Sequence, residues 1–125
     1  MAKRVLLAED EPNIVESLTF ILERSGFDVA TTTNGRQALE VALSDTPDIL
    51  ILDVMLPELD GYEVLRRLRA DARTKTLPVL MVTAKGPRED RETAMKCGAD
   101  MFITKPFVNS ELIAAVEKLA VDRPD

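Results

Sequence analysis

Apolar and polar residues follow two patterns that take turns along the chain. Short runs rich in apolar and β-branched residues are each followed by a longer segment in which apolar residues recur every three or four positions. The first pattern is typical of strands in a buried sheet, and the second is typical of amphipathic helices. Because the two patterns occur in turn five times, the sequence predicts five strands and five helices.

The predicted strands are short. The run 49–52 is wholly apolar, which is the composition expected of a strand that is covered on both faces of a sheet. The predicted strands cover residues 4–8, 27–31, 49–52, 78–82 and 101–103.

The predicted helices each place their apolar residues on one face. Pro12 suits the first turn of the first helix, which is expected to end before Gly26. Gly98 is expected to end the fourth helix, and Asn109 or Ser110 is expected to cap the fifth. The last four helices are expected near residues 38–42, 64–68, 88–97 and 112–119.

Strands that alternate with helices through short connections predict a doubly wound α/β fold with a parallel sheet. We expect residues 3–121 to form one domain and residues 122–125 to be a terminal tail or linker stub. No apolar run approaches the ~20 residues that cross a bilayer, and the apolar stretch near the N-terminus is too short for a signal peptide. A cytoplasmic location without membrane contact is therefore predicted.

Composition narrows the possible functions. The net charge is −6, which argues against direct binding to nucleic acid or to anionic lipid. The chain has no histidine, so serine–histidine and cysteine–histidine catalysis are excluded and the commonest zinc ligand is absent. The single cysteine, Cys97, cannot form a disulfide within the chain, and we assign it to packing. The same default assignment to the core applies to Met81, Met95 and Met101.

Polar residues follow four of the predicted strands within two residues of their ends. Glu9 and Asp10 follow the first, Asp53 the third, Thr83 the fourth and Lys105 the fifth. Ligands of open parallel sheets bind outside the carboxyl ends of the strands, so we expect these side chains to meet there. Three carboxylates at one edge repel one another by up to about 4 kcal/mol per close pair. An oxygen-only site of this kind predicts a bound Mg²⁺, with Mn²⁺ as an alternative.

With a cation present, Asp53 is a plausible nucleophile toward a phosphoryl group and would form an aspartyl phosphate. Thr83 could donate a hydrogen bond to one phosphoryl oxygen, and the Lys105 ammonium could stabilise the charge on another. Simpler roles stay open for each residue. Asp10 and Glu11 could only favour a helix N-terminus, and Asp53 could be a helix-cap or loop aspartate. Thr83 could only end a strand, and Lys105 could only form a salt bridge.

Four motifs give the chain a close resemblance to the receiver domains of bacterial two-component response regulators, the group that includes chemotaxis regulators. The motifs are Leu6-Leu7-Ala8-Glu9-Asp10-Glu11-Pro12, Asp53-Val54-Met55-Leu56-Pro57 with Asp60-Gly61, Val82-Thr83-Ala84 and Lys105-Pro106-Phe107. The resemblance implies a flavodoxin-like fold with strand order 2-1-3-4-5. It implies metal ligands at Glu9 and Asp10, the phosphoacceptor Asp53, the switch residue Thr83 and the phosphoryl-binding Lys105.

The resemblance also implies finer features of the site. The backbone carbonyl of Met55 would complete the metal shell, and the Lys105–Pro106 peptide bond would be cis. Phe102 occupies the family's aromatic switch position, although a core aromatic on a short strand explains Phe102 equally well. Glu9 replaces the commoner aspartate, which lengthens that side chain.

The implied function is a phosphorylation-dependent signalling switch in a two-component phosphorelay. A histidine kinase or histidine phosphotransfer protein would donate to Asp53, and the output would pass to a protein target, an effector domain or a phosphorylation-dependent dimer. The chain would not be an enzyme, apart from magnesium-dependent self-phosphorylation and autodephosphorylation at Asp53. We expect the change to involve the segment 88–97, which is highly charged and has few residues that can pack.

Two other functions compete with this one. A magnesium-dependent phosphatase of the haloacid dehalogenase type also uses an aspartyl nucleophile, but it has a second aspartate two residues later, where this chain has Met55. A flavodoxin-like binding module would need phosphate-binding glycines after the first strand, where this chain is acidic.

Overall fold

The computed structural model describes residues 2–83 and 88–121, with the backbone alone at 88–90. The predicted tail at 122–125 lies outside the described residues. Among the described residues, no helix is both long enough and apolar enough to cross a membrane. The elements are β1 (Arg4–Ala8), α1 (Pro12–Arg24), β2 (Asp28–Thr32), α2 (Gly35–Ser44), β3 (Ile49–Asp53), α3 (Gly61–Arg69), β4 (Val79–Thr83), α4 (Arg88–Cys97), β5 (Met101–Thr104) and α5 (Asn109–Val121).

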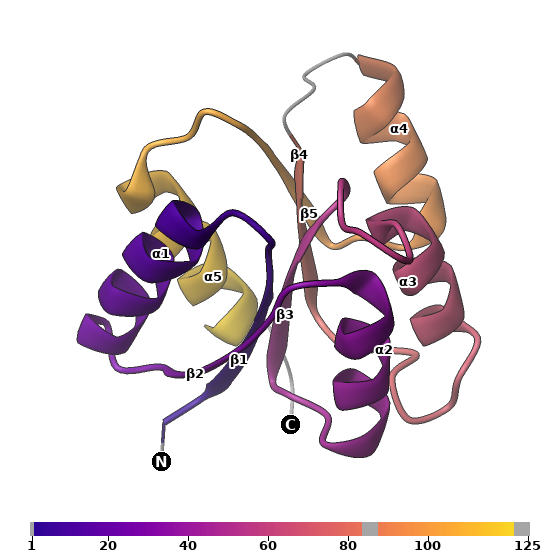
Figure 1. The fold of residues 1–125 in the computed structure, drawn as a ribbon, viewed down its shortest axis with the longest axis horizontal. Helices are drawn as coiled ribbons and strands as arrows, with labels where there is room; N and C mark the ends of the chain where they lie inside the picture. The colour runs from indigo at the N-terminus through magenta and orange to yellow at the C-terminus, as the bar shows by residue number, and fades with distance from the viewer. Residues whose placement is uncertain (1, 84–87, 122–125) are drawn as a thin grey trace.

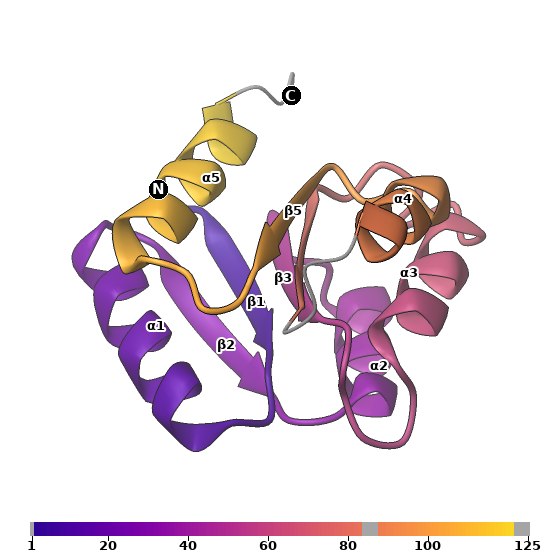
Figure 2. The same cartoon turned by 90° about the horizontal axis from the view of Figure 1, so that it is seen from above.

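The five strands form one parallel sheet in the order β2-β1-β3-β4-β5. Helices α1 and α5 cover one face of the sheet, and α2, α3 and α4 cover the other (Figures 1 and 2). The predicted doubly wound α/β fold and its strand order are therefore confirmed. The order places β3 in the middle, so Asp53 ends the most enclosed strand of the sheet.

The core consists of two apolar clusters, one on each face of the sheet. Successive residues of β3 point to opposite faces, so Leu50 and Leu52 pack under α2, α3 and α4, and Ile49 and Ile51 pack under α1 and α5. All five residues of β3 are buried. This explains why the strand is apolar until its last residue, Asp53.

The second strand begins one residue later than its apolar pattern predicts. The N–H group of Phe27 donates to the carbonyl of Leu22 at 3.1 Å, so Phe27 belongs to the turn that closes α1. Its buried side chain explains why it resembles a strand residue in the sequence.

Two predictions about the helices are wrong. Asn109 and Ser110 are the first residues of α5 and not caps before it, since the helix starts with the N–H of Glu111 donating to the Val108 carbonyl at 2.9 Å. Met95 does not pack in the core as predicted: 48% of it is exposed, because α4 places Ala94 in the core instead.

Two glycines let the segment between β3 and α3 pack closely against its surroundings. A Cβ atom on Gly61 would lie 2.4 Å from the carbonyl oxygen of Asp53 and 2.8 Å from the Cα of Val54. A Cβ atom on Gly35 would lie 1.7 Å from the carbonyl oxygen of Leu59. Because these neighbours are backbone atoms, they can move only if the segment itself moves.

We expect Gly61→Ala to lower the free energy of unfolding by about 1–3 kcal/mol, because the new methyl group overpacks the end of β3. The matched control is Gly26→Ala, where φ is +96° and no atom lies within 4 Å of the new Cβ. The control introduces backbone strain without a steric clash and costs about 1–2 kcal/mol. Urea unfolding and backbone NMR shifts distinguish the two. Unchanged shifts of Asp53 and Val54 in Gly61→Ala would contradict the expectation.

Candidate functional site

Glu9 and Asp10 leave β1 in different environments. The N–H group of Glu9 donates to the carbonyl of Thr32 at 3.1 Å, which extends the contact between β1 and β2 by one residue and buries Glu9. The Glu9 Oε2 atom accepts a hydrogen bond from the N–H of Glu11 at 3.2 Å. Asp10, one residue further on, is exposed. The sheet therefore fixes the Glu9 backbone, the Glu11 N–H holds its carboxylate, and Asp10 is left exposed to solvent.

Asp53 is held from two sides at the end of β3. The next peptide group continues the sheet, because the N–H of Val54 donates to the carbonyl of Val82 at 2.9 Å. The Asp53 Oδ1 atom accepts a hydrogen bond from the N–H of Met55 at 3.0 Å. Only 3% of Asp53 is exposed, which is close to the 2% of Glu9. Both residues are buried, whereas Asp10 is exposed.

Lys105 reaches the acids from the end of β5. Its N–H donates to the Thr83 carbonyl at 2.6 Å, and its peptide bond to Pro106 is cis. The Nζ atom lies 3.0 Å from Asp53 Oδ2 and 3.0 Å from Glu9 Oε1. Nζ also lies 3.6 Å from an oxygen of Glu11. One ammonium group thus contacts acids from two different strand ends.

Thr83 and Phe102 are placed differently with respect to this cluster. Thr83 ends β4 with 1% of its surface exposed, one residue beyond the Val82 that pairs with Asp53. Phe102 is half-buried in β5 and packs at the edge of the core cluster under α2, α3 and α4. A packing role accounts for this position of Phe102, and its signalling role stays a prediction.

The charges at this edge do not balance by themselves. Oxygen atoms of Glu9, Asp10 and Asp53 all lie within 4.8 Å of one another, and Lys105 supplies one positive charge in their midst. Burial raises the pKa of Glu9 to about 7, and the charge of Asp53 adds to this effect while the hydrogen bond from Lys105 opposes it. Burial lowers the pKa of Lys105, but hydrogen bonds to Asp53 and Glu9 outweigh burial and raise it overall. The fully ionised cluster carries two surplus negative charges.

The donor set suits a hard divalent cation. It offers carboxylate oxygens from Glu9, Asp10 and Asp53 and contains no nitrogen or sulfur ligand. Such a cation would neutralise the two surplus charges. The predicted contribution of the Met55 carbonyl stays a prediction, while the Met55 side chain itself is 60% exposed.

Two hollows border the cluster. One, of about 510 Å³, is lined by Asp10, by Asp60 just before α3, by Tyr62 of α3, and by residues 54–57. The other, of about 570 Å³, lies between α1 and the segment that joins β5 to α5. Its lining includes Lys105 and Phe107 and is largely apolar. The cluster is thus reachable from both sides of the sheet edge.

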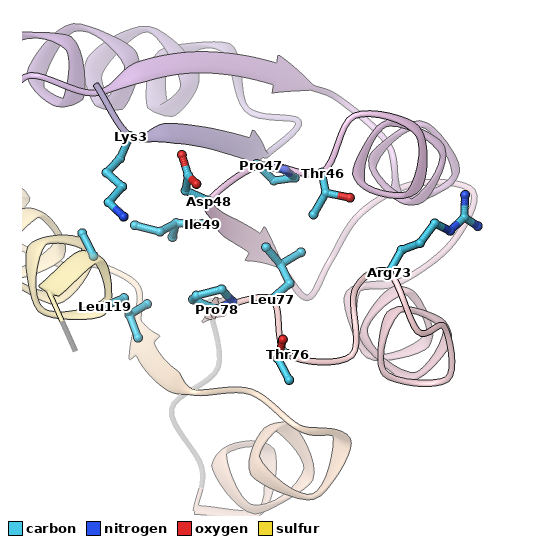
Figure 3. Close-up of a pocket in the computed structure, with 11 residues that line it drawn as sticks. Lys3, Thr46, Pro47, Asp48, Ile49, Arg73, Thr76, Leu77, Pro78 and Leu119 are labelled. Atoms are coloured by element: carbon cyan, nitrogen blue, oxygen red, sulfur yellow. The ribbon is translucent and has the colours of Figure 1, made fainter. Parts of the chain in front are cut away.

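A third cavity, of about 230 Å³, lies at the opposite edge of the sheet, where the strands begin (Figure 3). Lys3, Asp48 and Pro78 line it, and each of these residues lies just before a strand. This cavity contains none of the predicted site residues.

One contributor was missed from the sequence. The sequence offers Glu11 a role at the helix N-terminus and none in the site, but its carboxylate contacts the Lys105 ammonium. Its position two residues beyond Glu9 was the available signal, because that spacing returns the chain to the same side of the strand end.

Comparison with known proteins agrees with these observations. Residues 5–117 match the family model described as the response regulator receiver domain. The chain is 44% identical over 119 residues to the alkaline phosphatase synthesis transcriptional regulatory protein PhoP of Bacillus subtilis. This match covers 95% of the chain and 49% of PhoP. The chain thus spans about half the length of the curated relatives it matches.

Two solved structures are similar over nearly the whole chain. One is the signal receiver domain of a signal transduction histidine kinase from Syntrophus aciditrophicus, with a TM-score of 0.89, 36% identity and coverage of 99% of this chain and 96% of that one. The other is the receiver domain of the sensor histidine kinase PA1611 from Pseudomonas aeruginosa, with a TM-score of 0.84, 29% identity and coverage of 96% and 98%. That structure has a magnesium ion coordinated in its active site cleft.

We expect the stability of the metal-free protein to fall as pH rises from 5 to 8. Folded Glu9, with a pKa of about 7, holds its proton more tightly than the unfolded chain, where the value is 4.5. Its contribution is therefore fully present below the unfolded pKa and is lost as pH rises through the folded one. At about 1.4 kcal/mol per pKa unit, the loss is up to about 3 kcal/mol.

Urea unfolding in the presence of a chelator measures this dependence. Glu9→Gln should flatten the curve of stability against pH, whereas the exposed Glu16→Gln should leave it unchanged. Parallel curves for wild type and Glu9→Gln would show that Glu9 is not the group responsible.

Proposed function

Because the chain belongs to the response regulator receiver domain family, we propose that Asp53 is the residue that accepts a phosphoryl group. Receiver domains of this family are phosphorylation-dependent switches of two-component signalling and are generally not enzymes. The observation that carries the proposal is the convergence of Glu9, Asp10, Asp53 and Lys105 at one sheet edge. The receiver domain is proposed to extend over residues 3–121.

In the proposed reaction, an Asp53 carboxylate oxygen attacks the phosphorus of a phosphohistidine on a partner protein. The new O–P bond forms as the P–N bond breaks, and the partner's imidazole leaves. Lys105 already contacts Asp53 Oδ2 and can follow the charge to a phosphoryl oxygen with little movement. The N–H of Met55 fixes the orientation of the carboxylate, and Thr83 is the proposed hydroxyl donor to the phosphoryl group.

Glu9, Asp10 and Asp53 are the proposed ligands of Mg²⁺, and the Met55 carbonyl is a further proposed ligand. The all-oxygen donor set and the surplus of two negative charges support Mg²⁺, and Mn²⁺ fits the same donors. When bound, the cation would shield the negative charges of the carboxylate and the phosphoryl group from each other. Magnesium-dependent self-phosphorylation from small donors and autodephosphorylation are part of the proposal.

The proposed donor is a histidine kinase or a histidine phosphotransfer protein, which would meet the protein in the cytoplasm. The hollow beside Lys105 supports a donor that approaches between α1 and the start of α5, since Ile14 and Phe107 give it an apolar wall. The proposed output is a change in binding to a protein target, an effector domain or a second copy of the chain. Direct contact with nucleic acid is not proposed, given the net charge of −6.

The alternative of a phosphatase has less support. A second acid two residues after the nucleophile would be needed to protonate the leaving group, and that position holds the exposed Met55.

We expect wild-type protein to gain about 80 Da, the mass of one phosphoryl group, when it is incubated with Mg²⁺ and acetyl phosphate. Asp53→Asn should gain nothing, because its amide is not a nucleophile. Asp60→Asn is the matched control, since Asp60 is exposed and caps α3 through the N–H of Glu63. Intact-mass spectrometry reads the result. An equal adduct on Asp53→Asn would overturn the proposal.

We expect Glu11→Gln to tighten the binding of beryllofluoride, a phosphoryl analogue, in the presence of Mg²⁺. Glu11 competes for the Lys105 ammonium from 3.6 Å, and 63% of its side chain is exposed. An exposed ion pair contributes about 0.2–1 kcal/mol, so the dissociation constant should fall by at most about fivefold. A fluorescence or NMR titration measures this, with Glu16→Gln as the control. Weaker binding in Glu11→Gln would instead assign Glu11 to the metal site.

A further inference from the structure

Arg69, the last residue of α3, joins three separate parts of the chain. Its Nε and Nη2 atoms donate to the carbonyl oxygen of Gly98 at 3.0 and 2.8 Å. Its Nη1 atom donates to the Thr74 carbonyl at 3.0 Å, and Nη2 also lies 3.1 Å from Asp100 Oδ2. Only 19% of the side chain is exposed. We call Arg69, the two carbonyls and the Asp100 carboxylate the Arg69 clamp.

The clamp grips the carboxyl end of α4. The helix is closed by the N–H of Gly98, which donates to Met95, and by the N–H of Ala99, which donates to Ala94. Gly98 has φ +104°, and a Cβ there would lie 2.9 Å from the Cγ and Nε of Arg69, so the arginine lies directly on the glycine. A cation at this end of a helix is favourable because the last carbonyls carry partial negative charge.

The clamp also reaches the beginning of β4. Asp100 Oδ2 accepts a hydrogen bond from the N–H of Val79 at 2.8 Å, and the N–H of Asp100 donates to the Val79 carbonyl at 3.0 Å. Strand β4 runs from Val79 to Thr83, and Thr83 lies at the edge of the sheet where Asp53 ends β3. The same bonds therefore fix the start of β4 and the end of α4.

Helix α4 has little other anchoring through apolar contacts. Among the side chains described in α4, Ala94 is the one that is fully buried, and Met95 is 48% exposed. Arg91, Glu92 and Lys96 are exposed as well. A helix with so small a buried face depends on polar contacts at its ends.

We propose that Arg69 is a positioning residue of the switch, which fixes the carboxyl end of α4 so that phosphorylation at Asp53 acts on the amino end. The amino end follows Thr83 closely in the chain, whereas the carboxyl end is bonded to α3 and β4. The helix would then pivot about the Arg69 clamp. This inference rests on the proposed phosphorylation of Asp53.

Hydrogen exchange of α4 amides, with and without Mg²⁺ and beryllofluoride, tests the inference. In wild type, the analogue should change exchange in the amino half of α4 and leave the carboxyl half unchanged. In Arg69→Met, the carboxyl half should exchange about tenfold faster without analogue, as expected for the loss of hydrogen bonds to a charged donor. The response to the analogue should then spread over the whole helix.

Three further variants sharpen the result. Arg69→Lys keeps a cation near Gly98 and should restore part of the protection. Asp100→Asn keeps an acceptor for the N–H of Val79 and removes the ion pair, so it carries the test if Arg69→Met does not fold. Arg73→Met is the control, because Arg73 pairs with Asp71 at the surface. The side-chain hydrogen bonds of Arg73 go to Asp71 and to the Leu43 carbonyl, and neither residue belongs to α4.

Two outcomes would overturn the inference. Equal exchange at the carboxyl end of α4 in wild type and Arg69→Met would mean that the clamp does not hold the helix. Faster exchange in Arg69→Met with a response still confined to the amino half would leave Arg69 a purely structural residue. Failure of the proposed function is seen separately, as the absence of a phosphoryl adduct on wild type, and it would remove the inference with it.

Discussion

The ammonium group of Lys105 lies 3.0 Å from oxygens of both Glu9 and Asp53, and both of these acids are almost fully buried. Burial of a carboxylate is costly unless it is paired and hydrogen-bonded, so this one cation makes the arrangement of the acids possible. One cation cannot neutralise three acids, however. When all three acids are ionised, the cluster carries two surplus negative charges, and this surplus supports the proposed binding of a divalent cation.

The strand order of the sheet is what brings these groups together. Glu9 follows β1, Asp53 ends β3 and Lys105 follows β5, so residues far apart in the chain become neighbours at one edge. Parallel strands all end at the same edge, and β3 lies between β1 and β4. The glycine at position 61 matters for the same reason, because it lets α3 begin directly against the carbonyl of Asp53.

Much of this architecture could be predicted from the sequence, because the spacing of apolar residues and the polar residues that end the strands are local features of the chain. The run 49–52 and the acid after it sufficed to place Asp53 at the edge of a sheet. The contact between Glu11 and Lys105 could not be predicted in the same way, since it depends on how far a side chain reaches across two strand ends. The predictions of the α5 cap and of a buried Met95 were wrong because they depend on where a helix begins and how it is rotated. A shift of one residue changes both without changing the apolar pattern.

The Arg69 clamp was equally invisible in the sequence, where Arg69 belongs to a charged helix end of the kind usually exposed to solvent. In the structure it occupies the edge of the molecule opposite the Lys105 cluster, and β4 connects the two, from Val79 at the clamp to Thr83 near Asp53. A strand fixed at its beginning and buried throughout is a rigid reference, so a change at its far end cannot be absorbed by the strand itself. Under the proposed phosphorylation, the change would pass to a less tightly packed element that follows the strand, and among the described elements that is α4.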